Sequence, residues 1–204
     1  MSTLRGRFRP RVIGLLLAGL ALGGCLSKHT PTTHFYVLNP TVEEADTRGA
    51  GQAMSVLIEE VTLPDYLERG QIVSRETANR LYLSDFEQWG GSLRKDIGRV
   101  LATNLSRLLG TPHILVPPIG PYDRVDFRVN VLILGFESGP DEQARLQARW
   151  TIRGSEDGKA VAGRLSELTR PLPASADMDT RVSTLAALVG DLSHVIARSV
   201  PGTR

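Results

Sequence analysis

The stretch that decides the fold is VDFRVNVLILGF, residues 125–136. Apolar and polar residues alternate from Val125 to Ile133, which is the pattern of a β-strand with one buried face. From Leu132 to Phe136 the second face becomes apolar as well. A strand that is apolar on both faces fits a central place in a sheet. We therefore expect this strand to have neighbours on both sides and to be covered on both faces in its second half.

The next stretch, residues 143–153, alternates more strictly, with apolar residues on one face and polar residues on the other. Residues 154–158 supply the glycines and polar residues of a tight connection, and a further strand is predicted for residues 159–169. Strands joined by such short connections run antiparallel. The three strands are therefore predicted to form an antiparallel meander.

Three arginines lie on the polar face of the second strand: Arg145, Arg149 and Arg153. They could contact lipid headgroups or an acidic partner. A solvated face interspersed with glutamine explains the same pattern. We therefore leave these arginines out of the predicted site.

Two segments repeat apolar residues at spacings of three and four, which indicates amphipathic helices. The first runs from Leu93 to Leu108 and stops at Gly110, and the second covers residues 182–196. Shorter β segments are predicted at residues 34–38, 54–63, 71–74 and 80–83. This order predicts an α/β (or α+β) fold: a single mixed β-sheet with an antiparallel meander and two main amphipathic helices packed on it, covering one or both faces.

The N-terminus has the layout of a secretion signal, with an arginine-containing start, an apolar run over residues 12–22 and two glycines before Cys25. A membrane-spanning helix needs about 20 apolar residues, and this run is shorter. The residues Leu22-Gly23-Gly24-Cys25 resemble the bacterial lipobox, which implies cleavage before Cys25 and covalent lipid on its thiol. We predict a removed lipoprotein signal peptide (1–24), a lipid-anchored tether (25–33) and a single periplasmic domain (34–200).

The residue after the anchor sets the expected membrane. An aspartate there favours retention at the inner membrane of Gram-negative bacteria, whereas this chain has Leu26. A lipoprotein cysteine carries two or three acyl chains, which is enough for stable anchoring. We therefore expect the chain at the periplasmic face of the outer membrane.

Composition narrows the classes of partner and site. Cys25 is the only cysteine, so no disulfide can form within the chain. Removal of residues 1–24 takes four arginines away, and the formal charge falls from +2 to about −2, so nucleic acid is not an expected partner. No HExxH, CxxC, GxSxG, P-loop or GxGxxG motif occurs. We predict no catalytic residues, no metal and no cofactor beyond the lipid on Cys25, while a hydrolase assembled from distant residues stays open.

Several motifs resemble one known family. They are LPDYLERGQIVSR at residues 63–75, Trp89, the helix that holds Leu101, Asn104, Leu105 and Leu109, and the aromatic opening HFYVL at residues 34–38. Together they are similar to the PqiC/YmbA family of ABC-type transport auxiliary lipoproteins over essentially the whole mature chain. Gly70 replaces a common proline of that family. Gly90-Gly91 replaces a better helix-forming pair, so we expect the first helix to begin only at Ser92.

The resemblance implies a non-enzymatic subunit of an intermembrane lipid transport system built around MCE-domain proteins. The lipoprotein would dock the periplasm-spanning MCE-domain transport protein at the outer membrane and support envelope integrity, and an inner-membrane partner would complete the system. The alternative is a periplasmic lipoprotein that itself binds a small apolar ligand or lipid in a pocket between sheet and helices. Self-association into a homo-oligomer is open under both hypotheses.

The turn inside the longest motif is the predicted partner-binding site, because loops carry binding residues disproportionately. Its residues are Pro64, Asp65, Tyr66, Leu67, Arg69 and Gln71. The alternative is that Tyr66 and Leu67 only pack the turn against the sheet. Trp89, just before the first helix, is predicted to be a core residue rather than an interface anchor.

Overall fold

The computed structural model describes residues 31–43, 54–120 and 125–202. From Thr33 onward these residues belong to one compact unit. The predicted signal peptide and Cys25, the predicted lipidation site, lie outside the described residues.

Strand β6, Phe127–Ser138, stands at the centre of a mixed sheet, as its sequence predicts. Its partners are β2 (Val56–Thr62) and β3 (Gln71–Thr77), both parallel to it, and β7 (Gln143–Gly154), which is antiparallel. β8 (Ala160–Pro171) pairs with the other side of β7, so the predicted antiparallel meander is confirmed. The strands of the described residues form one sheet of eight.

The remaining strands are β1 (His34–Tyr36), β4 (Arg80–Trp89) and β5 (Ile114–Leu115). β4 is longer than the predicted segment 80–83. The prediction stopped short because the second half of this strand is mostly polar in sequence. Antiparallel pairing to β3 on one side and parallel pairing to β1 on the other supply the hydrogen bonds that extend it. Sheet context of this kind routinely overrides local β preference.

The two predicted helices are α2 (Leu93–Leu109) and α3 (Met178–Ala197). α2 begins after Ser92, whose side-chain oxygen accepts a hydrogen bond from the Lys95 N–H at 3.4 Å. The two preceding glycines therefore stay outside the helix, as expected. α2 ends at Gly110, which has a φ of 65°. Glycine adopts this left-handed conformation at little cost.

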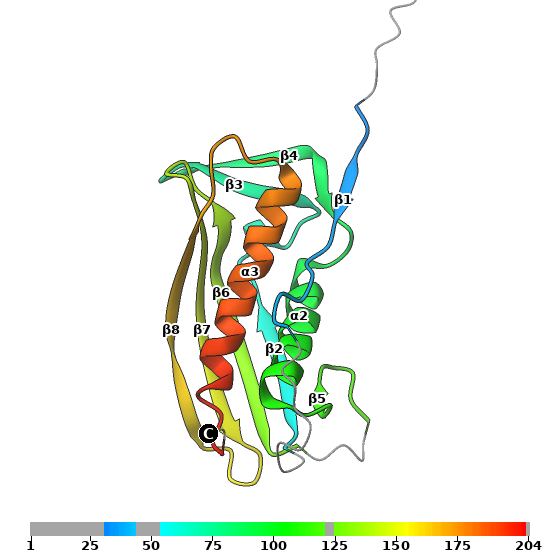
Figure 1. The fold of residues 1–204 in the computed structure, drawn as a ribbon, viewed down its shortest axis with the longest axis vertical. Coiled ribbons are helices and arrows are strands. Elements are labelled where there is room, and N and C mark those ends of the chain that lie inside the picture. Colours follow the sequence, from blue (N-terminus) through cyan, green and yellow to red (C-terminus); the bar gives the residue numbers. More distant parts are fainter. Residues whose placement is uncertain (1–30, 44–53, 121–124, 203–204) are drawn as a thin grey trace, which may run out of the picture. The chain divides into compact units, whose positions relative to one another are not determined.

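Both helices pack on the same side of the sheet and against each other; α3 crosses in front of β6 and β7 in Figure 1 and also contacts β8. We call this side the helix face. On β7 it carries Ala144, Leu146, Ala148, Trp150 and Ile152, all at most 1% exposed. The other side is the open face, which carries Leu132 on β6, Arg145, Gln147 and Arg149 on β7, and Leu165 on β8.

The second half of β6 corrects one expectation. The sequence predicts that it is covered on both faces, but Leu132 and Leu134 are 40% and 38% exposed. The physical reason is that α2 and α3 both lie on the helix face, so neither α-helix covers these leucines on the open face. The apolar pattern therefore predicts the central position of β6 correctly. It does not predict that two leucines of its second face are in contact with solvent.

Candidate functional site

The turn in the longest motif directly follows β2 and forms one turn of 3₁₀ helix, η1 (Asp65–Leu67). The Leu67 N–H donates a hydrogen bond to the Pro64 carbonyl at 2.9 Å. Leu67 is 2% exposed and packs into the core, whereas Asp65 and Arg69 are exposed. The turn is thus anchored by one apolar side chain and presents charged ones.

Tyr66 contacts a buried carboxylate, that of Glu137 at the end of β6. The Tyr66 hydroxyl donates to Oε2 at 2.9 Å, and the Phe136 N–H donates to the same oxygen at 2.8 Å. Arg75 donates to Oε1 from Nε at 2.9 Å and from Nη2 at 2.7 Å. Glu137 is 7% exposed. One carboxylate therefore fixes both Tyr66 and Arg75, near the two ends of the motif.

The electrostatics of this cluster keep both side-chain donors in their donating form. Burial, followed by the negative charge of Glu137, raises the pKa of Tyr66. The hydrogen bonds to Glu137 raise the pKa of Arg75. At neutral pH the phenol therefore keeps its proton and the guanidinium keeps its charge.

The structure separates the six predicted partner-binding residues into two groups. Leu67 is buried and Tyr66 is half-buried against Glu137, so these two pack the turn. Asp65 and Arg69 are exposed, and Pro64 and Gln71 are half-buried. Sequence reasoning missed Glu137, whose only signal was a lone glutamate at the end of an apolar strand.

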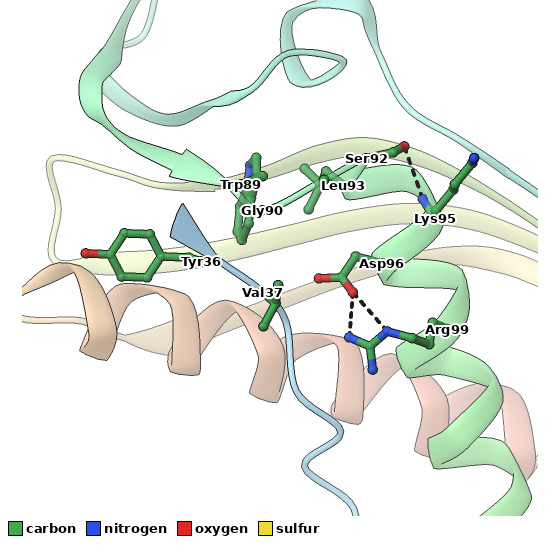
Figure 2. Close-up of a pocket in the computed structure, with 10 residues that line it drawn as sticks. Tyr36, Val37, Trp89, Gly90, Ser92, Leu93, Lys95, Asp96 and Arg99 are labelled. Carbon is green, nitrogen blue, oxygen red and sulfur yellow. Dashed lines mark hydrogen bonds and ion pairs between the residues drawn. The ribbon is translucent and has the colours of Figure 1, made fainter. Parts of the chain in front are cut away.

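A cavity of about 210 Å³ lies where the N-terminal segment, the end of β4 and the start of α2 meet (Figure 2). Tyr36 and Val37 line it from the N-terminal segment, Trp89 from β4, and Asp96 and Arg99 from α2. Trp89 is 6% exposed and belongs to the hydrophobic core, which confirms its predicted role.

Asp96 ties the N-terminal segment to α2. Its carboxylate accepts a hydrogen bond from the Leu38 N–H at 2.6 Å and another from Arg99 Nε at 3.0 Å. Arg99 Nη2 also donates to the Leu38 carbonyl. Both backbone polar groups of Leu38 are satisfied by this ion pair, so the segment that follows β1 has a defined position on the helix.

β1 is also held to β4 by side chains. His34 Nδ1 lies 3.3 Å from Glu87 Oε1. Hydrogen bonding to Glu87 is the main cause that raises the pKa of Tyr36 to about 12, and the same contact lowers the pKa of Glu87. The aromatic opening motif is thus attached to the sheet and to α2 through separate carboxylates.

A second cavity, of about 200 Å³, shares Gly91, Ser92 and Leu93 with the first and is lined by the motif turn and the start of α2. The motifs at residues 34–38 and 63–75 therefore meet around the beginning of α2, although they are far apart in sequence. Each cavity is smaller than the roughly 300 Å³ at which small-molecule sites begin. The site offers a structured surface rather than an enclosed chamber.

Two further findings concern the described residues alone. Among them, no three His, Cys, Asp or Glu side chains lie close enough to hold a metal ion. None of their helices is long and apolar enough to cross a membrane.

One open mixed sheet, two helices on a single face and a charged turn held by a buried glutamate define a two-layer α/β domain. The model of one family matches residues 36–197 of the chain. The chain belongs to that family, the ABC-type transport auxiliary lipoprotein components.

Two relatives agree with this assignment, and two solved structures share the fold. The chain is 24% identical over 137 residues to the intermembrane transport lipoprotein PqiC of Escherichia coli strain K12, which covers 67% of this chain and 71% of the relative. PqiC of Shigella flexneri matches with the same values. The crystal structure of an uncharacterized protein has a TM-score of 0.68 at 21% identity, covering 82% of this chain and 98% of that one. A protein of Xanthomonas campestris has a TM-score of 0.68 at 14% identity, covering 81% and 93%. At these identities the solved structures show the fold alone.

Proposed function

We propose that this chain is a non-enzymatic outer-membrane lipoprotein subunit of an intermembrane lipid transport system. In this role it docks a periplasm-spanning MCE-domain transport protein at the outer membrane and supports envelope integrity, and an inner-membrane partner completes the system. The family match over residues 36–197 carries the proposal, and a relative named as an intermembrane transport lipoprotein supports it. The lipobox ending at Cys25, followed by Leu26, supports the anchor and the membrane.

The geometry of the motif turn supports docking as the role of this domain. Leu67 and the Tyr66–Glu137 hydrogen bond hold the turn in one conformation, and Asp65 and Arg69 are presented to solvent. A preorganised surface binds more tightly than a mobile one, because less conformational entropy is lost on association.

One observation favours the alternative of a lipid carrier. A cavity of about 530 Å³ lies between β2, the start of α2 and the Pro117-Pro118 segment, and Val61, Gly98 and Val116 supply apolar surface to it. Its lining also includes Glu59, Glu60, Arg94 and Lys95. An acyl chain in this cavity would remove water from charged groups at a cost in free energy. For this reason docking remains the preferred function.

Affinity purification of the full-length lipoprotein from detergent-solubilised envelopes tests the docking role. In cells that express an MCE-domain protein, we expect that protein in the purified fraction. Arg69→Glu should lower its recovery, while Lys159→Glu, in the exposed β7–β8 connection, serves as the matched control. If the lipoprotein is purified from such cells and no MCE-domain protein is recovered with it, the proposal is contradicted.

Native mass spectrometry of the domain without its anchor tests the alternative. A co-purifying lipid of defined mass inside the folded domain would favour the carrier. A spectrum of protein without lipid would favour the docking subunit.

Fractionation of a Leu26→Asp variant tests the predicted membrane. We expect the variant to move from the outer to the inner membrane. An unchanged distribution would contradict the sorting rule on which the outer-membrane assignment rests.

A further inference from the structure

The open face of the sheet carries an apolar patch that the motif turn does not explain. Leu132 and Leu134 on β6 and Leu165 on β8 are 40%, 38% and 44% exposed. Leu132 is the register partner of Arg149, and Arg149 is the register partner of Leu165. Neighbouring strands lie about 4.8 Å apart, so the two leucines flank the arginine within one row about 10 Å long. Single exposed leucines are ordinary, whereas a contiguous group indicates an interaction site.

Arg149 makes no hydrogen bond or ion pair with any described residue, and it is exposed. Of the other arginines on the open face, Arg153 donates a hydrogen bond to the Gly158 carbonyl at 3.2 Å, and two are neutralised by carboxylates. Arg128 pairs with Glu59 at 2.8 Å, and Arg145 pairs with Asp141. The neighbouring carboxylate of Glu167 accepts a hydrogen bond from Gln147 at 2.8 Å. The positive charge at the centre of the leucine patch therefore has no partner within the described chain.

These observations change the interpretation of the β7 arginines. The solvated-face explanation requires polar neighbours, but the register neighbours of Arg149 on both adjacent strands are leucines. Along β7 itself its same-face neighbours are Gln147 and Thr151. Arginine flanked by apolar side chains is nevertheless enriched at the centres of protein interfaces. A guanidinium also pairs with a carboxylate through two parallel hydrogen bonds, which adds specificity.

We propose that Leu132, Leu134, Arg149 and Leu165, here called the open-face patch, dock a protein segment that carries a carboxylate between apolar side chains. The carboxylate pairs with Arg149, and the apolar side chains cover the leucines. Space for such side chains exists beside the patch, where Arg149, Gly163 and Leu165 line a hollow of about 590 Å³. An anionic membrane surface fits less well, because the exposed side chains of Glu60 and Glu167 lie on the same face and repel it.

The open-face patch does not include the exposed charges of the motif turn. It lies on the same face of the sheet as Glu137, the residue that holds this turn in place. Glu137, which holds Tyr66, is the register partner of Arg145 and so belongs to the open face. The proposal does not require the partner to be an MCE-domain protein. It requires only a protein with the stated chemistry.

Photo-crosslinking in living cells tests the proposal on the full-length lipoprotein. A photoreactive amino acid is placed at Leu165, and in a second strain at the exposed His194 on α3 as a control. We expect the photoreactive residue at position 165 to crosslink to a protein other than this chain. The crosslinked peptide should contain Asp or Glu beside apolar residues. Arg149→Glu should lower the yield about tenfold or more, as expected for reversal of one charge in a close pair.

Lys159→Glu is the matched charge reversal, and we expect it to leave the crosslink unchanged. Because both substituted residues are exposed, both variants should keep the wild-type thermal unfolding temperature. Crosslinks only to lipid, crosslinks only to a second copy of this chain, or no crosslink at Leu165 would each overturn the proposal. A crosslink that is unaffected by Arg149→Glu would overturn it as well.

The outcome can be separated from the docking function proposed above. Capture of an acidic, apolar segment from a protein without an MCE domain would support the open-face patch, and the affinity purification then decides the docking function separately. Recovery of an MCE-domain protein, together with a Leu165 crosslink that is insensitive to Arg149→Glu, would support docking and reject the patch.

Discussion

Glu137 connects the most recognisable sequence motif to the sheet. A buried carboxylate is costly unless donors satisfy it, and four hydrogen bonds are donated to this one. If the carboxylate is removed, Tyr66 and Arg75 lose their acceptor in a partly buried position. The motif therefore depends on a residue that lies outside it.

Glu137→Ala should lower the free energy of unfolding by about 3 kcal/mol, as expected when one member of a buried pair is lost. Tyr66→Phe removes a single hydrogen bond and should cost about 1 kcal/mol. Urea unfolding followed by tryptophan fluorescence measures both. A loss below about 0.5 kcal/mol for Glu137→Ala would show that the cluster does not stabilise the fold.

The sequence predicts the role of a single residue where that role depends on residues nearby in the chain. Trp89 precedes an amphipathic helix, and its place in the core follows from that position. The role of Glu137 depends on Arg75 and Tyr66, which lie 62 and 71 residues away in the chain. Nothing in the strand itself indicates where those donors will be.

At the scale of elements, the start of α2 is defined by Ser92 rather than by helix propensity. Ser92→Ala removes the hydrogen bond to the Lys95 N–H and should cost about 1 kcal/mol of stability. Ser92→Gly should cost only a few tenths of a kcal/mol, because glycine is tolerated at this position. Equal losses for the two variants in chemical unfolding would contradict this account of the cap.

The β1–β4 contact should depend on pH. The pKa of Glu87 is lowered in the folded state, mainly by its hydrogen bond with Tyr36, so its contribution is complete above about pH 5 and is lost as pH falls through the folded pKa. The pKa of Tyr36 is raised to about 12, so its contribution is complete below about pH 10 and is lost between that pH and about 12.

Glu87→Gln should therefore flatten the acid limb of stability against pH, measured as the urea midpoint from pH 3 to 7. Tyr36→Phe should flatten the alkaline limb. Glu156→Gln, in the exposed β7–β8 connection, is the control and should keep the wild-type profile. An unchanged acid limb in Glu87→Gln would show that this carboxylate does not couple β1 to the sheet.

Elements with strong periodicity were predictable, and those defined by tertiary pairing were not. The alternation in β7 and the helical spacing in α2 and α3 report burial directly. β4 continues to Trp89 only because β1 and β3 flank it. The exposure of Leu132 depends on which face of the sheet the two helices cover. The sequence of β6 alone does not indicate which face that is.

At the scale of the whole molecule, placing both helices on one face leaves the sheet with two different sides. One side forms the core, and the other carries the buried Glu137 cluster and the open-face patch. The predicted partner-binding turn and the patch can therefore be tested independently, because the turn presents Asp65 and Arg69 while the patch centres on Arg149. A partner that needs both surfaces would be lost on substitution at either one.

The predicted anchor adds a limit on distance. Seven residues, 26–32, lie between Cys25 and Thr33, where the compact unit begins, so the distance from anchor to unit is at most roughly 30 Å. Inserting 20 Gly/Ser residues after Thr32 would add a root-mean-square reach of about 25 Å. If docking requires the domain to work close to its membrane, this variant should fractionate with the outer membrane but complement envelope integrity poorly. A Gly/Ser replacement of residues 26–32 at constant length should complement like the wild type. Full complementation by the lengthened chain, measured as detergent resistance of a deletion strain, would show that the partner is not met at the membrane surface.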